Sequence, residues 1–296
     1  MAEAGARVKA GLPLRFFPQA NSHPMPSASL RILLDFFEHH LQFTPTAGQI
    51  DRFERDLHLV SPDLMAAALK EAAANRGLIG RSFDAQRAAI LTIYYRKVAE
   101  HAQLFPIFHT FETAFRSTVA VELESHYARA AWWRPVRTAL LRGDPARSVA
   151  HLHGVNLSKD AAHLIGQIIY SIEGDSFQRS QLGSVEDGYA FTELCDLSHI
   201  GELIAQHWSV FSPRYFRPGK TMTLQEFTGK FRTVREARNQ VYHHRSVAQM
   251  RSIVVAAEHL LDRLGCSLSF SYKKITVART SQPQFTALAT NQNNLF

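Results

Sequence analysis

The chain has 296 residues, of which 46% are hydrophobic and 20% charged, as in ordinary globular proteins. No apolar run is long enough to span a bilayer, and the proline-interrupted N-terminus does not resemble a signal peptide. We therefore expect a cytoplasmic protein with no membrane contact. The net charge of +7 is carried mostly by arginine, which favours bidentate contacts to phosphate, although a GC-rich genome would give the same excess.

The first part of the chain is expected to hold a flexible arm and a small helical unit. Residues 1–28 contain four prolines and little periodicity, which is typical of a flexible arm. Residues 29–80 have helical periodicity, with a short helix expected over 49–57. Ser61-Pro62 supplies an N-cap and a proline at the first helical position, which predicts a helix that ends near Arg76.

A longer region, residues 81–265, is expected to form one helical bundle. Helices are predicted over about 84–103, 107–127, from near Ser158 onward and over 194–211, with a polar loop over 174–188. The basic segment 129–147 also contains Trp132 and Trp133. Its arginines could hold an RNA backbone while an aromatic ring stacks on a base, or the tryptophans could close the end of the bundle.

Two strongly amphipathic helices follow. Thr223-Leu-Gln-Glu226 is a capping box, and Phe227, Phe231, Val234 and Val241 form an apolar stripe behind it. Ser246-Val-Ala-Gln249 is expected to be a second capping box that opens a helix closed by Gly265. Within residues 266–296 we expect one short strand, over 267–275, and then a disordered tail. The predicted fold is all-α with a minor C-terminal strand.

The turn between these helices holds the residues best suited to chemistry. Asn239 and His243 are four residues apart and so share a helix face, and the long Arg238 side chain can reach the same place. An imidazole can transfer a proton near neutral pH, a guanidinium can stabilise charge on a phosphoryl group, and an amide can orient either. Because RNA supplies its own 2′-hydroxyl nucleophile, this set suits phosphodiester cleavage without a metal.

Spacing alone is weak support for this interpretation. Arg96 and His101 show the same Arg-x4-His spacing, and we assign them no role. The alternative is that Arg238 and His243 have no catalytic role and belong to a solvated helix end, where cationic side chains interact favourably with the helix dipole. We favour a site because Asn239 follows the arginine directly and the cluster lies between two amphipathic helices.

The pattern Arg238-Asn239-x-x-x-His243, at the end of one bundle helix and before another, resembles the signature of the HEPN superfamily. Those are helical domains, many of them metal-independent ribonucleases of bacterial toxin–antitoxin and phage-defence systems. The run from Glu112 and Arg116 to Tyr127 and the tryptophan pair is similar to the Abi-like (abortive-infection) branch. The glycine expected after Tyr127 is Ala128 here. The resemblance covers roughly residues 85–265, and residues 1–80 have no counterpart in it.

The resemblance implies a homodimer in which two Arg-Asn-x-x-x-His segments meet to form one composite cleft. Arg238 and His243 would then be the principal catalytic residues, with Asn239 in support. Tyr242 and His244 flank the motif and could support the site. Packing is an equally good interpretation of Tyr242, and solvent exposure is an equally good one of His244. Glu112 and Arg116 could support the cleft or form an ordinary surface ion pair. The expected RNA-binding residues are Arg129, Arg134, Arg137, Arg142 and Arg245.

No metal or cofactor is expected. Cys195 and Cys266 are far apart and lack metal-ligand spacing, which fits a reducing compartment, and the histidine pairs have no further ligands near them in sequence. The expected function is therefore a metal-independent endoribonuclease that acts on RNA and is restrained by an antitoxin or a sensing partner. The alternative is a non-catalytic, dimeric scaffold that binds RNA or nucleotide.

Overall fold

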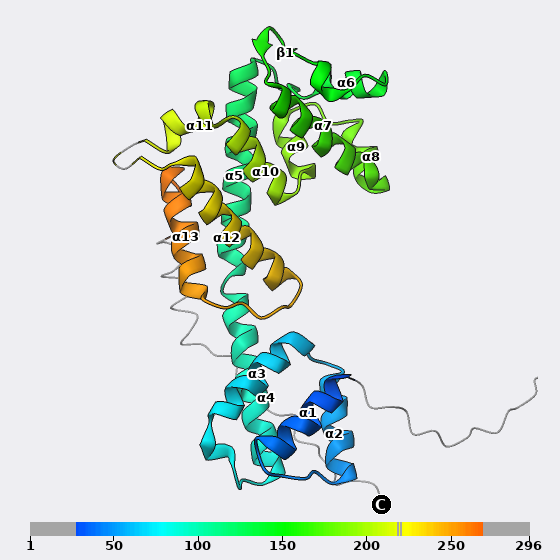
Figure 1. Cartoon of the computed structure of the whole chain (residues 1–296), viewed down its shortest axis with the longest axis vertical. Coiled ribbons are helices and arrows are strands. Elements are labelled where there is room, and N and C mark those ends of the chain that lie inside the picture. Colours follow the sequence, from blue (N-terminus) through cyan, green and yellow to red (C-terminus); the bar gives the residue numbers. More distant parts are fainter. Residues whose placement is uncertain (1–27, 218, 220, 269–296) are drawn as a thin grey trace, which may run out of the picture.

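The computed structural model describes residues 28–217, 219 and 221–268. The molecule is elongated along α4 (Phe83–Ala102) and α5 (Phe105–Tyr127), which follow one another along its long axis (Figure 1). Within the described residues the fold is mainly helical, with one two-stranded antiparallel sheet, so the all-α prediction is confirmed. None of the described helices combines the length and apolar character needed to cross a bilayer.

The N-terminal helices form a separate hydrophobic core. They are α1 (Ala28–His39), α2 (Ala47–Leu57) and α3 (Pro62–Ala74). The side chain of Ser61 accepts from the backbone N–H of Leu64, as expected of the N-cap before Pro62. Ile90 and Tyr94 belong to the same core, so the first half of α4 packs with the predicted unit 29–80.

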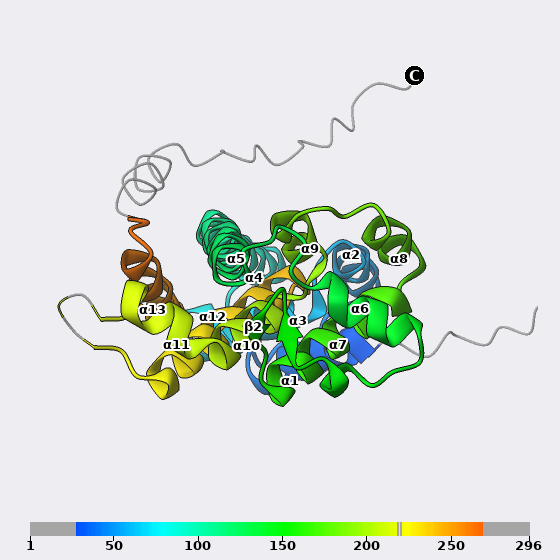
Figure 2. The same ribbon diagram turned by 90° about the horizontal axis from the view of Figure 1, so that it is seen from above.

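The larger core surrounds α5. The remaining elements are β1 (His151–Leu152), β2 (Val155–Asn156), α6 (Arg134–Leu141), α7 (Lys159–Gly174), α8 (Ser176–Leu182), α9 (Gly188–Leu194), α10 (Leu197–Gln206), α11 (Trp208–Tyr215), α12 (Leu224–Tyr242) and α13 (Met250–Arg263). Helices α11 to α13 lie to one side of α5, and α6 to α9 lie to the other (Figure 2). Between them, α10 contacts α5, α7 and α12, so one helix joins the two sides into a single core.

Two predicted segments are wrong. The polar loop over 174–188 contains α8, because the Asp175 carboxylate accepts from the N–H groups of Phe177 and Gln178 and starts a helix there. The single helix predicted over 194–211 is two helices, α10 and α11, which are separated at His207, and Leu194 is the last residue of α9.

The second capping box is also absent. Helix α13 begins at Met250, and its N-cap, Gln249, has a left-handed backbone (φ 57°) with no side-chain cap. Residues 246–248 instead line a pocket of about 300 Å³ that faces α3 and α4, and Val247 packs against the larger core. The strand predicted over 267–275 falls, except for its first two residues, outside the described part of the chain.

Candidate active site

The motif lies on the last turns of α12, whose sequence determines both its start and its buried face. Thr223 and Glu226 form the predicted capping box, with Glu226 N donating to Thr223 Oγ1 over 3.1 Å and Thr223 N donating to Glu226 Oε2 over 2.9 Å. Phe227, Phe231, Val234, Ala237 and Val241 are buried, which confirms the predicted stripe. The opposite face of the helix is consequently turned outward.

Arg238 is held by groups from two helices. Its Nη2 atom donates to Oε2 of Glu112 on α5 over 3.2 Å, and Nη1 donates to Oδ1 of Asn239 over 3.2 Å. The guanidinium carbon lies 4.2 Å from the centroid of the Tyr242 ring, a cation–π contact. Each contact restricts the orientation of the planar guanidinium, so the side chain is positioned before any ligand arrives.

Glu112 connects this arginine to a second one. Its Oε1 atom accepts from Nη2 of Arg116 over 2.7 Å, while Arg116 Nη1 donates to the carbonyl oxygens of Thr192 and Cys195. The Glu112 and Arg116 side chains are only 18% and 12% exposed, so this is not an ordinary surface ion pair. The network thus ties the end of α9 through α5 to Arg238.

The histidines lie where α12 ends. The N–H of His244 donates to the carbonyl of Val241 and that of Arg245 to the carbonyl of Gln240, the two hydrogen bonds of a Schellman motif. His244 occupies the left-handed position of that motif (φ 55°), where glycine is usual. The side chains of Asn239, His243, His244 and Arg245 are exposed. A single chain therefore leaves the imidazoles open to solvent.

Tyr242 has a packing role in addition to its contact with Arg238. Its ring meets the Phe105 ring at the start of α5 edge-on, with 5.2 Å between centroids. On the other side of the turn, the Ser61 hydroxyl of the N-terminal unit donates to the carbonyl oxygen of His244 over 2.7 Å. Neither partner was predicted, since contacts between residues so far apart in sequence leave no local pattern.

The second Arg-x4-His pair differs in environment. The Arg96 guanidinium is bound by Glu71 of α3, and the His101 side chain is buried, at 8% exposure. Burial lowers the pKa of His101, which disfavours its charged form. The two pairs have the same sequence spacing. They differ in environment, because His101 is buried whereas His243 is exposed.

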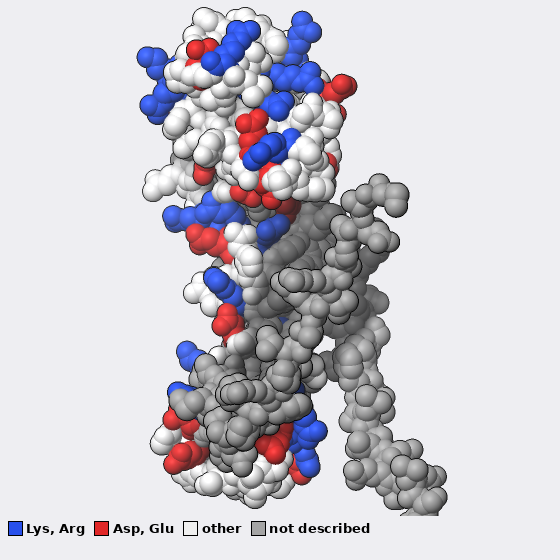
Figure 3. All heavy atoms as spheres, turned by 90° about the vertical axis from the view of Figure 1, so that its right-hand side faces the viewer, with Lys and Arg blue, Asp and Glu red and all other residues white. Residues whose placement is uncertain are grey.

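The predicted RNA-binding arginines of the basic segment lie far from the motif. They follow the C-terminal end of α5, while Phe105 and Tyr242 meet at its N-terminal end, and a 23-residue helix is about 35 Å long. Arg134 donates to the carbonyl of Val185 over 2.8 Å, and Arg137 pairs with Glu173 at 3.2 Å. Arg129 and Arg142 are exposed and, with Arg134, line a surface pocket of about 720 Å³. Figure 3 shows several basic side chains at this end of the molecule, interspersed with acidic ones.

The tryptophans of this segment cannot stack on an RNA base in this structure. Trp132 and Trp133 are both fully buried, and Trp133 stacks on Phe191 with 4.7 Å between ring centroids. The prediction that a tryptophan stacks on an RNA base is thus wrong. The packing instead shows the two tryptophans closing the end of the bundle.

The chain matches no protein-family model, and no curated protein or solved structure shows significant similarity to it. The resemblance to the HEPN superfamily therefore rests on the Arg238-Asn239-x-x-x-His243 motif and the order of the helices. Among the described residues, no three His, Cys, Asp or Glu side chains form a group that could hold a metal ion. In physical terms the molecule is a helical bundle with a positioned arginine on the last turns of α12 and exposed imidazoles where that helix ends.

Proposed function

We propose that this protein is a metal-independent endoribonuclease of HEPN type, acting in the cytoplasm of a bacterium in defence or as a toxin. The observation that carries the proposal is the placement of Arg238, fixed by Glu112, Asn239 and Tyr242 five residues before the exposed His243. A guanidinium that is already oriented needs little reorganisation to stabilise charge as it develops on a phosphoryl group.

The reaction that suits these groups is transesterification. The ribose 2′-oxygen attacks the adjacent phosphorus, the P–O5′ bond breaks, and the products are a 2′,3′-cyclic phosphate and a 5′-hydroxyl. One imidazole accepts the proton from the 2′-hydroxyl as a general base, and a second group gives a proton to the 5′-oxygen as a general acid. Arg238 stabilises the charge on the non-bridging oxygens.

The need for both a base and an acid supports a homodimer. Each chain contributes one His243, exposed at the end of α12, so two copies meeting at this turn would supply both proton-transfer groups. His244 is the other imidazole at hand, on the same chain, and its left-handed backbone directs it away from the helical continuation. An enzyme of this kind requires restraint in the cell, so an antitoxin or a sensing partner belongs to the proposal.

A second candidate is the non-catalytic scaffold that binds RNA or nucleotide. The ion pair between Glu112 and Arg238 counts for it over catalysis, because the carboxylate offsets the positive charge that would stabilise charge developing on a phosphoryl group during cleavage. We rank it second because binding alone does not require an arginine fixed beside an exposed imidazole.

The deciding experiment is the cleavage of total bacterial RNA by purified protein in excess EDTA. We expect the wild type to cut and to leave cyclic phosphate ends, and His243→Ala and Arg238→Ala to lower the rate by at least about 100-fold. His58→Ala and Arg251→Ala, which remove exposed side chains of the same kinds, serve as matched controls and should cut normally. If the wild type and all variants bind RNA but none cuts it, the scaffold replaces the enzyme.

The composite cleft has its own test. If both subunits contribute His243, the rate per chain should fall when the protein is diluted below the dissociation constant of the dimer, as measured by sedimentation. Cleavage by a species shown to be monomeric would eliminate the composite cleft and leave His244 as the second imidazole.

A further inference from the structure

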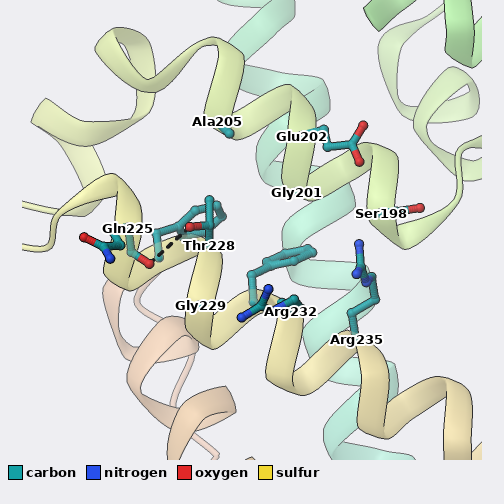
Figure 4. Close-up of a pocket in the computed structure, with 11 residues that line it drawn as sticks. Ser198, Gly201, Glu202, Ala205, Gln225, Thr228, Gly229, Arg232 and Arg235 are labelled. Atoms are coloured by element: carbon teal, nitrogen blue, oxygen red, sulfur yellow. Dashed lines mark hydrogen bonds between the residues drawn. The ribbon is translucent and has the colours of Figure 1, made fainter.

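A groove separates α10 from α12 on the outward side of the bundle. It has a volume of about 510 Å³, within the size range of small-ligand sites, and it lies among the residues labelled in Figure 4. Phe227 and Phe231 also contribute to its lining, but their side chains are almost fully buried. Gly201 allows the helices to approach, because a Cβ atom there would lie 2.7 Å from the Phe231 ring. At Gly229, by contrast, a Cβ atom would have no neighbour within 4 Å, so the absent side chain leaves open space.

The rim of this groove is polar and carries a net positive charge. Arg232 and Arg235 come from α12, and Glu202 with Ser198 from α10. Figure 4 shows Arg235 extending toward α10, on the side where Ser198 and Glu202 lie. Among the described residues Arg232 forms no ion pair, and the nearest acid to Arg235 is Glu236, at 4.0 Å. The two guanidinium groups are therefore available to an anionic ligand.

The arginines of the groove lie on the same face of α12 as Asn239 and His243 of the candidate active site. At about 100° per residue, Arg232, Arg235, Asn239 and His243 fall within roughly one quarter of the circumference of α12. Arg235 precedes Asn239 by one turn, or about 6 Å along the helix axis. A ligand that follows this face of α12 thus passes from Asn239 and His243 to the two arginines of the groove without leaving the helix.

We infer that this groove binds single-stranded RNA next to the scissile phosphate, with an unstacked base inside the groove and flanking phosphates on Arg232 and Arg235. The inference rests on the proposed ribonuclease function and adds a substrate class to it. Positively charged grooves with an apolar surface for bases are the usual means of holding single strands. A duplex keeps its bases stacked and paired, so it cannot place one in the groove without opening.

Binding is measured in a His243→Ala background, so that the RNA is not cut. The probes are a fluorescent ten-nucleotide RNA strand and the same strand in a duplex, titrated by anisotropy at several salt concentrations. We expect the single strand to bind at least tenfold more tightly than the duplex. Gly229→Trp, which fills the open space in the groove, should remove this preference and lower the affinity for the single strand at least tenfold.

The arginines are tested by their salt dependence. Arg232→Ala with Arg235→Ala should reduce the slope of log K against log salt by about 0.7 for each phosphate that is no longer bound. Gly48→Trp is the matched control for Gly229→Trp, since it too is a helical glycine with open space around it. Arg251→Ala is the control for the arginines. Melting temperatures should show that each variant is folded, and Gly229→Trp should be at least as stable as wild type, since it removes a glycine from a helix.

The outcomes separate this inference from the proposed function. If wild type cuts RNA in EDTA but Gly229→Trp binds and cuts the single strand normally, the groove inference fails and the ribonuclease stands. If no variant cuts, yet Gly229→Trp loses single-strand binding and Gly48→Trp keeps it, the groove stands and the enzyme fails. A Gly229→Trp protein that changes from dimer to monomer would show that a second copy of the chain occupies the groove, and the inference would be overturned.

Discussion

Acidification should destabilise the fold through His207, whose side chain is 5% exposed. Its Nδ1 atom is 2.8 Å from the carbonyl oxygen of Leu203, and its Nε2 atom is 2.8 Å from the Tyr127 hydroxyl. A carbonyl oxygen can only accept, so Nδ1–H donates to Leu203, and Nε2 accepts from Tyr127 in the neutral ring. Burial lowers the pKa of His207 to about 4, because a charged imidazole would be poorly solvated there.

The sign and size of the effect follow from the difference between the folded and unfolded pKa. An unfolded histidine titrates near pH 6.5, so between about pH 6.5 and 4 the unfolded state binds more protons than the folded state. The free energy of unfolding therefore falls as the pH is lowered through this window. A difference of about 2.5 pKa units corresponds to about 3 kcal/mol in total, and nothing is lost through this group above pH 6.5.

The assay is urea unfolding of wild type and His207→Gln at several values between pH 7 and 4. Glutamine keeps a donor and an acceptor but does not titrate, so subtracting the two stabilities removes the contribution of all other groups. The wild-type advantage at pH 7 should shrink by about 3 kcal/mol, or reverse, by pH 4. An advantage that stays constant over the whole range would show that His207 is protonated as easily in the folded protein as in the unfolded chain, and would refute the reasoning.

Three further substitutions have expected outcomes. Ala128→Gly should raise the free energy of unfolding by up to about 1 kcal/mol in urea titrations, since Ala128 ends α5 with a left-handed backbone (φ 53°) that suits glycine. Glu112→Ala should lower the free energy of unfolding by about 2 kcal/mol, because it leaves two partly buried guanidinium groups without a carboxylate. The same variant should slow RNA cleavage as strongly as Arg238→Ala does. Normal cleavage would exclude a positioning role for Glu112. Gly201→Ala should cost about 1–3 kcal/mol because its methyl group overlaps the Phe231 ring, and an unchanged unfolding midpoint would contradict the close approach of α10 and α12.

The parts of the fold that could be predicted are those determined locally. The capping box at Thr223 and Glu226 and the apolar stripe behind it give the start and the buried face of α12 directly, because both depend on neighbours within a few residues. The start of α3 at Ser61-Pro62 is of the same kind. Near residue 246 the local pattern failed, because Val247 packs against the larger core and the helix begins only at Met250, and a capping box worth about 1 kcal/mol does not decide against tertiary packing.

The candidate site could be predicted only in part. The motif on α12 was visible, but the positioning of Arg238 depends on Glu112, 126 residues earlier in the chain. The groove beside it depends on how closely α10 packs at Gly201, which no local pattern reports. The distance between the motif and the basic segment could have been anticipated, since both flank one long helix and helix length follows from residue number.

The hydrogen bond from Ser61 to the carbonyl of His244 gives the N-terminal helices a second connection to the end of α12. The first connection is covalent and runs from the N-terminal helices through α4 into α5 (Figure 1). The second is this hydrogen bond. Two attachments at different points resist twisting in a way that one hinge does not. The end of α12 consequently cannot rotate relative to the N-terminal helices unless this hydrogen bond breaks or the junction between α4 and α5 bends.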